Sequence, residues 1–386
     1  MGAFDLTEEE RALAELARRV AEERVAPRAA EIDLEDRFPD DLRRLFGELE
    51  LMGLGIPAAY GGGGAGLLAV CLVIEELARV SAAASLIVAD HELGLLPVLV
   101  GASEEQKRAW LPAIASGERL MAFALTEPEA GSDAARLSMR AVRRGDRYVL
   151  SGTKRFITHG NVADSLTVFA STDPEKGSKG ITCFLVDRET PGLSVTKLER
   201  KMGLHGSPTA ELLFEEVEVP VENRIGEEGQ GFRIAMATLD HSRPGIAAQA
   251  LGIAQGALDQ AVAYARERRQ FGRPIADFQA IQFMIADMAI AVESARALTY
   301  KAATVVEEAD HGRLDWRMAN RYSAMAKTYA SDVAMRVTTD AVQIFGGYGY
   351  IADYPVERMM RDAKITQIYE GTNQIQRLVI ARSYLS

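Results

Sequence analysis

The chain has 386 residues, which is more than one hydrophobic core usually organises, so two or three domains are expected. A hydrophobic share of 48% and a charged share of 26% are typical of a soluble globular protein. The net charge of -11 at pH 7 disfavours a nucleic-acid partner, because phosphate binding needs a basic face.

The start of the chain lacks the basic and apolar stretches of a secretory signal, and the apolar run at 67–74 is too short to cross a bilayer. Cys71 and Cys183 stand far apart with no CxxC pattern. They are expected to be buried free thiols in a cytoplasmic protein. The five histidines show no metal-ligand spacing, so neither a metal site nor membrane insertion is predicted.

Residues 1–119 are predicted to form a helical domain. A T-x-x-E capping box at Thr7 and Glu10 begins an amphipathic helix that continues to Pro27. A second box, at Ser103 and Gln106, begins a helix that extends to residue 114. Further helices are predicted over 42–51 and 67–80, joined by segments that carry glycine or proline.

Near residue 120 the pattern changes to short β-type runs, so residues 120–229 are predicted to form a middle β domain. Turn clusters at 144–146 and 173–174 separate some of the runs, and no helical pattern comes between them. Consecutive strands of this kind indicate an antiparallel, barrel-like sheet rather than βαβ units. The predicted strand segments lie within 141–152, 165–172, 180–187, 193–199 and 210–219.

Residues 230–386 return to a helical period and are predicted to form a four-helix bundle. A heptad-like seam continues along one predicted helix through Phe278, Ile281, Ile285, Met288, Val292 and Ala295. Pro244 is expected to bend or interrupt its helix. The fold class is therefore mostly α with a central β domain, in the order α–β–α.

Two glycine clusters match dinucleotide-binding patterns, GxGxxG at 61–66 and GxGxxA at 347–352. That mechanism needs a strand before the glycines and a helix that starts at the phosphate. Neither cluster follows a strand-like run. Both are interpreted as glycine turns that end helices.

Six longer segments carry a family resemblance. They are FALTEPEAGSD (123–133), KRFITHG (154–160), LDHSRPGIAAQALGIAQ (239–255), RRQFGRPIADFQ (268–279), QIFGGYGY (343–350) and RDAKITQIYEGTNQIQR (361–377). In order and spacing they resemble the acyl-CoA dehydrogenases, over nearly the whole chain. The resemblance agrees with the α–β–α order read from the sequence periods.

The resemblance implies an FAD-dependent oxidoreductase that oxidises the Cα–Cβ bond of a saturated short- to medium-chain acyl-CoA to trans-2-enoyl-CoA. Glu370 matches the base that removes the α-proton, while a hydride passes from Cβ to FAD N5. This chemistry needs a carboxylate in a water-poor site, because desolvation raises its pKa toward neutrality. A minority of the family places the base at the position of Ser242, which has no carboxylate.

The resemblance also assigns binding residues. Those expected to contact FAD are Phe123, Leu125, Thr126, Ser132, Phe156, Ile157, Thr158, Arg268, Phe271, Gln279, Gln343, Ile344, Gly346, Gly347, Thr372, Asn373 and Gln374. The set from Arg268 to Gly347 would contact the FAD of a neighbouring subunit. Those expected to contact substrate are Ser132, Asp240, Arg243 and Gly371, although Arg243 could instead be a structural ion-pair partner.

The implied partners are an acyl-CoA, electron-transferring flavoprotein as electron acceptor, and three further copies in a homotetramer built as a dimer of dimers. One alternative is a related flavoenzyme on the same scaffold, such as an oxidase, a monooxygenase or a nitroalkane oxidase. Another is a flavin-free homologue that acts as a binding protein. A branched or dicarboxylic acyl group stays open, because pocket depth depends on packing.

Overall fold

The structure is a computed structural model that describes residues 6–385. Both predicted capping boxes are present, at Thr7 with Glu10 and at Ser103 with Gln106. The first helix continues past Val20 as a π-helical and then a 3₁₀ segment to Arg28. The α-helices of the N-terminal region are α1 (Glu8–Val20), α2 (Ala29–Glu35), α3 (Asp40–Glu48), α4 (Leu67–Ala78), α5 (Ala82–Gly101) and α6 (Glu104–Ala115).

Helix α5 was not predicted from the sequence. It passes through the core and buries side chains all around its circumference, so it has no amphipathic period. Within the described residues it is the one helix long and apolar enough to cross a membrane, yet 78% of that apolar window is buried inside the protein. It is a core helix that packs on α4, α7 and strand β1.

The middle region forms one open sheet. Its order is β6-β7-β3-β2-β4-β5-β8, and β1 pairs with β4 in parallel. The other pairs are antiparallel except for a short parallel β2–β4 contact, and no pairing closes β6 onto β8 within residues 6–385. The strands are β1 (Met121–Ala124), β2 (Arg140–Arg144), β3 (Arg147–Thr158), β4 (Ser165–Ser171), β5 (Ile181–Asp187), β6 (Leu193–Leu198), β7 (Thr209–Pro220) and β8 (Arg224–Ile225).

The C-terminal region is helical. Its elements are α7 (Gly231–Glu267), β9 (Arg269–Gln270), β10 (Arg273–Pro274), α8 (Gln279–Asp310), α9 (Trp316–Phe345), α10 (Pro355–Ala363) and α11 (Asn373–Leu385). Helices α7, α8 and α9 pack together, and the shorter helices α10 and α11 both pack on α9. Residues 61–66 follow the 3₁₀ segment Ala58–Tyr60, and residues 347–350 lie within the 3₁₀ segment Gly346–Tyr350 that follows α9, so no strand directly precedes either glycine cluster.

Of the two outcomes expected at Pro244, a bend or an interruption, the interruption does not occur, because α7 continues through this residue. A proline removes one backbone donor inside a helix, and isolated helices rarely tolerate that loss. Here Pro244 is buried, and α4, α5 and α9 all pack on α7. This tertiary packing outweighs the local cost.

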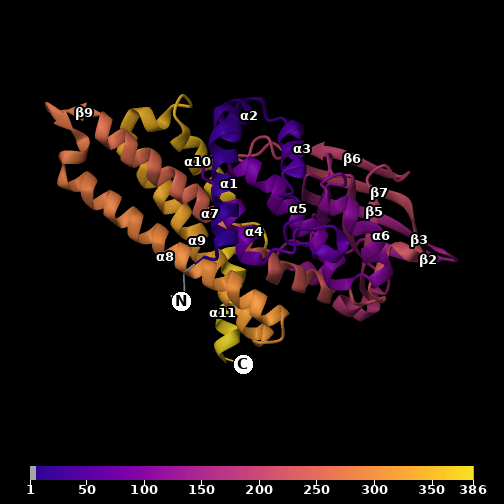
Figure 1. The fold of residues 1–386 in the computed structure, drawn as a ribbon. Coiled ribbons are helices and arrows are strands. Elements are labelled where there is room, and N and C mark those ends of the chain that lie inside the picture. The colour runs from indigo at the N-terminus through magenta and orange to yellow at the C-terminus, as the bar shows by residue number, and fades with distance from the viewer. Residues whose placement is uncertain (1–5, 386) are drawn as a thin grey trace.

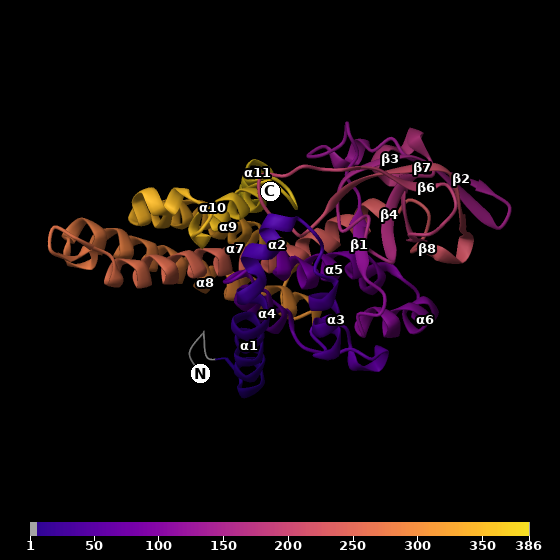
Figure 2. The same cartoon turned by 90° about the horizontal axis from the view of Figure 1, so that it is seen from above.

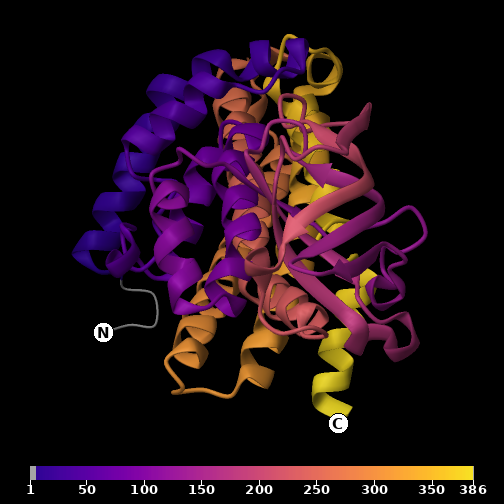
Figure 3. The ribbon, with the colours of Figure 1, turned by 90° about the vertical axis from the view of Figure 1, so that its right-hand side faces the viewer.

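The sheet and the β9–β10 tip of the α7–α8 hairpin lie at opposite ends of the molecule (Figures 1 and 2). Viewed from the sheet end, the N-terminal helices and the strands lie on either side of the long C-terminal helices (Figure 3). One cluster of buried apolar side chains includes residues from all three regions. A pocket lined by residues from all three regions lies at their junction.

Candidate active site

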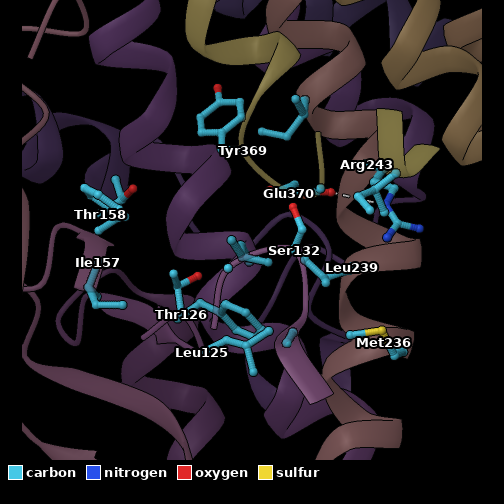
Figure 4. Close-up of a pocket in the computed structure, with 18 of the residues that line it drawn as sticks. Leu125, Thr126, Ser132, Ile157, Thr158, Met236, Leu239, Arg243, Tyr369 and Glu370 are labelled. Atoms are coloured by element: carbon cyan, nitrogen blue, oxygen red, sulfur yellow. Dashed lines mark hydrogen bonds between the residues drawn. The ribbon is translucent and has the colours of Figure 1, made fainter. Parts of the chain in front are cut away.

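The pocket is formed by α5, the segment that follows β1, the end of β3, the first half of α7 and the loop before α11. Figure 4 shows Glu370 entering from that loop, with Thr126 and Thr158 on the strand side of the pocket. Arg243 projects from α7 beside Glu370. The pocket thus has one wall with a carboxylate and another with hydroxyl groups.

The backbone at Glu370 and Gly371 is unusual, because both residues are left-handed, with φ of 52° and 92°. A non-glycine residue at positive φ is uncommon and needs support from its surroundings. The Glu370 carbonyl accepts hydrogen bonds from Gln376 Nε2 at 3.0 Å and, more weakly, from Arg243 Nε at 3.5 Å. This loop conformation turns the Glu370 side chain into the pocket.

The Glu370 carboxylate accepts a hydrogen bond of 2.5 Å from Ser242 Oγ. Burial raises the pKa of Glu370 to about 7, although the Ser242 hydrogen bond and the charges of Arg243 and Lys327 act in the opposite direction. A carboxylate with a pKa in the neutral range can both accept and release a proton at physiological pH. Glu370 therefore has the properties of a general base.

The opposite wall suits a flat aromatic ring with polar edges. Leu125 and Ile157 give it apolar surface, and the Thr126 and Thr158 hydroxyls form no hydrogen bond within the described part of the chain. Phe156 lies at the rim with 58% of its surface exposed, and the Arg155 guanidinium lies over its ring, 5.0 Å from the ring centre. These groups fit an isoalloxazine ring, which combines apolar faces with hydrogen-bonding edges.

A buried ion pair holds the loop that carries Thr126. Lys154 Nζ lies 2.8 Å from Glu127 Oε1, and the two side chains are 0% and 3% exposed. The lysine also donates to the Leu125 carbonyl, and Glu127 accepts from the Ser138 and Met139 backbones. The pair thereby ties the segment after β1 to strand β3, and these are the two segments that form the hydroxyl wall.

Three family models match the chain in succession. They are the N-terminal domain of acyl-CoA dehydrogenase over residues 7–118, the middle domain over 122–217, and the C-terminal domain over 229–385. The chain belongs to the acyl-CoA dehydrogenase family. Its members are FAD-dependent oxidoreductases, so FAD is the cofactor of this enzyme.

Individual relatives match this chain over nearly its whole length. The cyclohex-1-ene-1-carbonyl-CoA dehydrogenase of Geobacter metallireducens is 52% identical over 98% of this chain and 99% of that protein. The structure of butyryl-CoA dehydrogenase from Megasphaera elsdenii is 45% identical, with a TM-score of 0.95 over 99% of this chain and 100% of that one. A chain in a structure described as the electron transferring flavoprotein of Acidaminococcus fermentans is 49% identical, with a TM-score of 0.95 over 99% of both chains.

The structure separates the expected FAD residues of this acyl-CoA dehydrogenase into two places. Phe123, Leu125, Thr126, Ser132, Phe156, Ile157 and Thr158 line the pocket with Glu370 and Gly371, whereas Arg268, Ile344, Gly346 and Gly347 line an open groove near the β9–β10 tip. Phe271, Gln279 and Gln343 are exposed in the same part of the chain. One chain alone therefore does not gather the whole set.

Asp240 and Arg243 form an ion pair of 2.5 Å between Asp240 Oδ1 and Arg243 Nη1. Asn320 donates to the other carboxylate oxygen of Asp240, which does not line the pocket. Arg243 does line it, so this residue is both an ion-pair partner and a pocket residue. Asp240 is better placed to orient Arg243 than to contact a substrate.

The three residues after Gly371 have different environments. Asn373 is buried, and its side-chain amide is hydrogen-bonded to Lys327, Ser331 and Asp332. Its side chain is therefore occupied within the protein. Thr372 Oγ1 accepts from the Ile375 backbone at the start of α11, and Gln374 is exposed.

The sequence analysis missed three polar groups around the pocket. Asp90 on α5 lines it, with Oδ2 3.4 Å from Nδ1 of His159, and burial raises the pKa of that carboxyl. Tyr369 also lines the pocket and donates to Gln249. Lys327 lies behind the Glu370 loop. Asp90 and Lys327 lie outside the motifs read from the sequence, whereas Tyr369 lies within the 361–377 motif but was not singled out there.

Proposed function

We propose that this enzyme removes the α-proton of a short- to medium-chain acyl-CoA with Glu370 and releases trans-2-enoyl-CoA. The observation that carries the proposal is the Glu370 carboxylate, held by Ser242 across the pocket from the Thr126 and Thr158 hydroxyls. Bound FAD supplies the acceptor for the hydride that leaves Cβ. The chain itself binds the thioester, excludes water and accepts the α-proton at the Glu370 carboxylate.

The pocket residues around Thr126 and Thr158 would hold the flavin ring, and the groove around Arg268 would hold the pyrophosphate and adenosine of an FAD in a neighbouring copy. An arginine suits this role because its fork matches phosphate oxygens. Separation of the two sets within one chain supports a dimer that shares its cofactors, and we propose that two such dimers form the homotetramer.

The substrate class rests on the relatives. The solved butyryl-CoA dehydrogenase supports a short straight acyl chain, and the cyclohexene-carbonyl relative supports a test of ring-bearing acyl groups. Electron-transferring flavoprotein is the proposed acceptor, supported by the similar chain in the Acidaminococcus fermentans structure. The two buried free cysteines support a cytoplasmic location for the protein.

Anaerobic titration with a panel of acyl-CoAs tests the substrate assignment. Butyryl-CoA and octanoyl-CoA are expected to bleach the flavin most rapidly, with neighbouring lengths accepted, because a pocket discriminates by only ~1–3 kcal/mol per methylene. Palmitoyl-, isobutyryl-, glutaryl- and cyclohexene-carbonyl-CoA complete the panel. Bleaching by a branched, dicarboxylic or cyclic acyl-CoA alone would contradict the assignment, and rapid oxygen consumption would indicate an oxidase.

The raised pKa of Glu370 predicts a pH dependence. Only the carboxylate form can accept the α-proton, and the pKa of this group is raised to about 7 by burial. The rate constant for flavin reduction at low butyryl-CoA is therefore expected to fall about tenfold for each pH unit below neutrality. Stopped-flow measurement across the acid and neutral range checks this, and a flat profile down to the usual range of a carboxyl pKa would contradict it.

A further inference from the structure

A lysine lies directly behind the Glu370 loop. Lys327 on α9 has no exposed surface and does not line the pocket. Its Nζ donates to the Gly371 carbonyl at 2.8 Å and to Asn373 Oδ1 at 2.9 Å. A buried ammonium is costly unless it is paired with a negative charge. Both of these acceptors are uncharged.

The backbone of the loop is left-handed at both Glu370 and Gly371, a conformation that needs support from its surroundings. Hydrogen-bond donors to the two carbonyl groups provide that support. Gln376 Nε2 donates to the carbonyls of Glu370 and Gly371, at 3.0 and 3.2 Å. Arg243 adds a longer contact to the first carbonyl, and Lys327 a shorter one to the second. Among these donors Gln376 carries no charge, and Arg243 already pairs with Asp240.

We propose that Lys327 is a positioning residue for the base, which holds the Gly371 carbonyl and stabilises the negative form of the Glu370 carboxylate. The inference rests on the proposed role of Glu370. The hydrogen bonds of Lys327 hold the loop on the side away from the pocket. Its positive charge favours the ionised form of Glu370, although the lysine does not line the pocket. A structural lysine would supply only the first of these effects.

The charged groups around Lys327 favour this coupling. Glu370 from the loop and Asp332 from α9 stabilise its ammonium, whereas Arg243 from α7 and burial oppose it. Burial is the largest effect and lowers the pKa of Lys327 to about 7. Each charge favours the other, since Lys327 favours the ionised form of Glu370 and Glu370 favours the ammonium of Lys327.

The groups that face the carboxylate itself set the direction of the effect. Ser242, Arg243 and Lys327 favour the ionised form of Glu370, whereas Asp90 from α5 opposes it. Removal of the Lys327 charge therefore raises the pKa of Glu370. The acid limb of the rate profile should move to higher pH.

The test uses FAD-loaded enzyme and the pH dependence of flavin reduction by butyryl-CoA. Lys327→Met removes both the donor and the charge, and Lys327→Gln keeps a donor but no charge. Both variants are expected to shift the acid limb upward by about one unit, with KM nearly unchanged. Lys301→Met, at an exposed position on α8, is the matched control and should keep the wild-type profile.

A third variant covers the case in which both Lys327 variants fail to fold. Asp332→Asn removes a carboxylate that favours the ammonium, at a side chain with 39% exposure. It should shift the limb in the same direction by a smaller amount. If the folded variants keep the wild-type pH dependence on the acid side, the inference about Lys327 is overturned. The proposed function would still stand in that case if Glu370→Gln loses flavin reduction.

Discussion

Glu370→Gln is expected to bind butyryl-CoA and yet to reduce its flavin at least ~10²–10⁴-fold more slowly than the wild-type enzyme, which is the usual contribution of a positioned general base. Glutamine preserves the size of the side chain and can still accept the Ser242 hydrogen bond through its amide oxygen. It cannot take up the α-proton. Single-turnover stopped-flow reduction under anaerobic conditions measures this loss.

A matched control separates loss of the base from general damage. Glu92 on α5 is another glutamate whose pKa burial raises to about 7, and it does not line the pocket. Glu92→Gln should therefore reduce its flavin at nearly the wild-type rate. Equal rates in the two variants would exclude Glu370 as the base.

The second large effect concerns the ion pair between Glu127 and Lys154. Lys154→Met leaves the Glu127 carboxylate buried without its counter-charge, and breaking such a pair costs ~3–5 kcal/mol. The Ser138 and Met139 donors remain, so the expected loss lies near the lower end. The segment that carries Thr126 should also loosen, and the purified variant should retain less FAD.

Urea unfolding and the flavin absorbance per chain measure the two consequences. Lys197→Met is the control, because Lys197 forms an ion pair with Glu199 at the surface and has 51% exposure. Exposed pairs contribute only ~0–1 kcal/mol. Lys154→Met combined with Glu127→Gln should recover part of the stability. A Lys154→Met protein as stable and as yellow as the control would contradict the proposed role of the pair.

The periodic parts of the fold were predictable from the sequence. The strands alternate or form short apolar runs between turn residues, and the seam through Met288 and Val292 marks the face of α8 that is buried. Helix α5 could not be found in this way, because it is buried on all sides. The passage of α7 through Pro244 was also beyond local rules, since distant helices provide the packing that tolerates it.

The candidate site also has a part that could be predicted from the sequence and a part that could not. Glu370, Thr126 and Thr158 stand in long motifs, so a resemblance carries them over residue by residue. The contacts that give Glu370 its properties depend on packing between helices far apart in the sequence. Ser242 illustrates this, since it was noted only as a position without a carboxylate, and the structure makes it the hydrogen-bond partner of Glu370.

The most direct measurement isolates the proton step from the hydride step. A 3-thiaacyl-CoA carries sulfur in place of Cβ, so it offers an acidic α-hydrogen and no hydride. In D₂O the wild-type enzyme should exchange that α-hydrogen for deuterium, at a rate that falls as Glu370 becomes protonated, and Glu370→Gln should show almost no exchange. Exchange at the wild-type rate in the glutamine variant would mean that another group abstracts the proton.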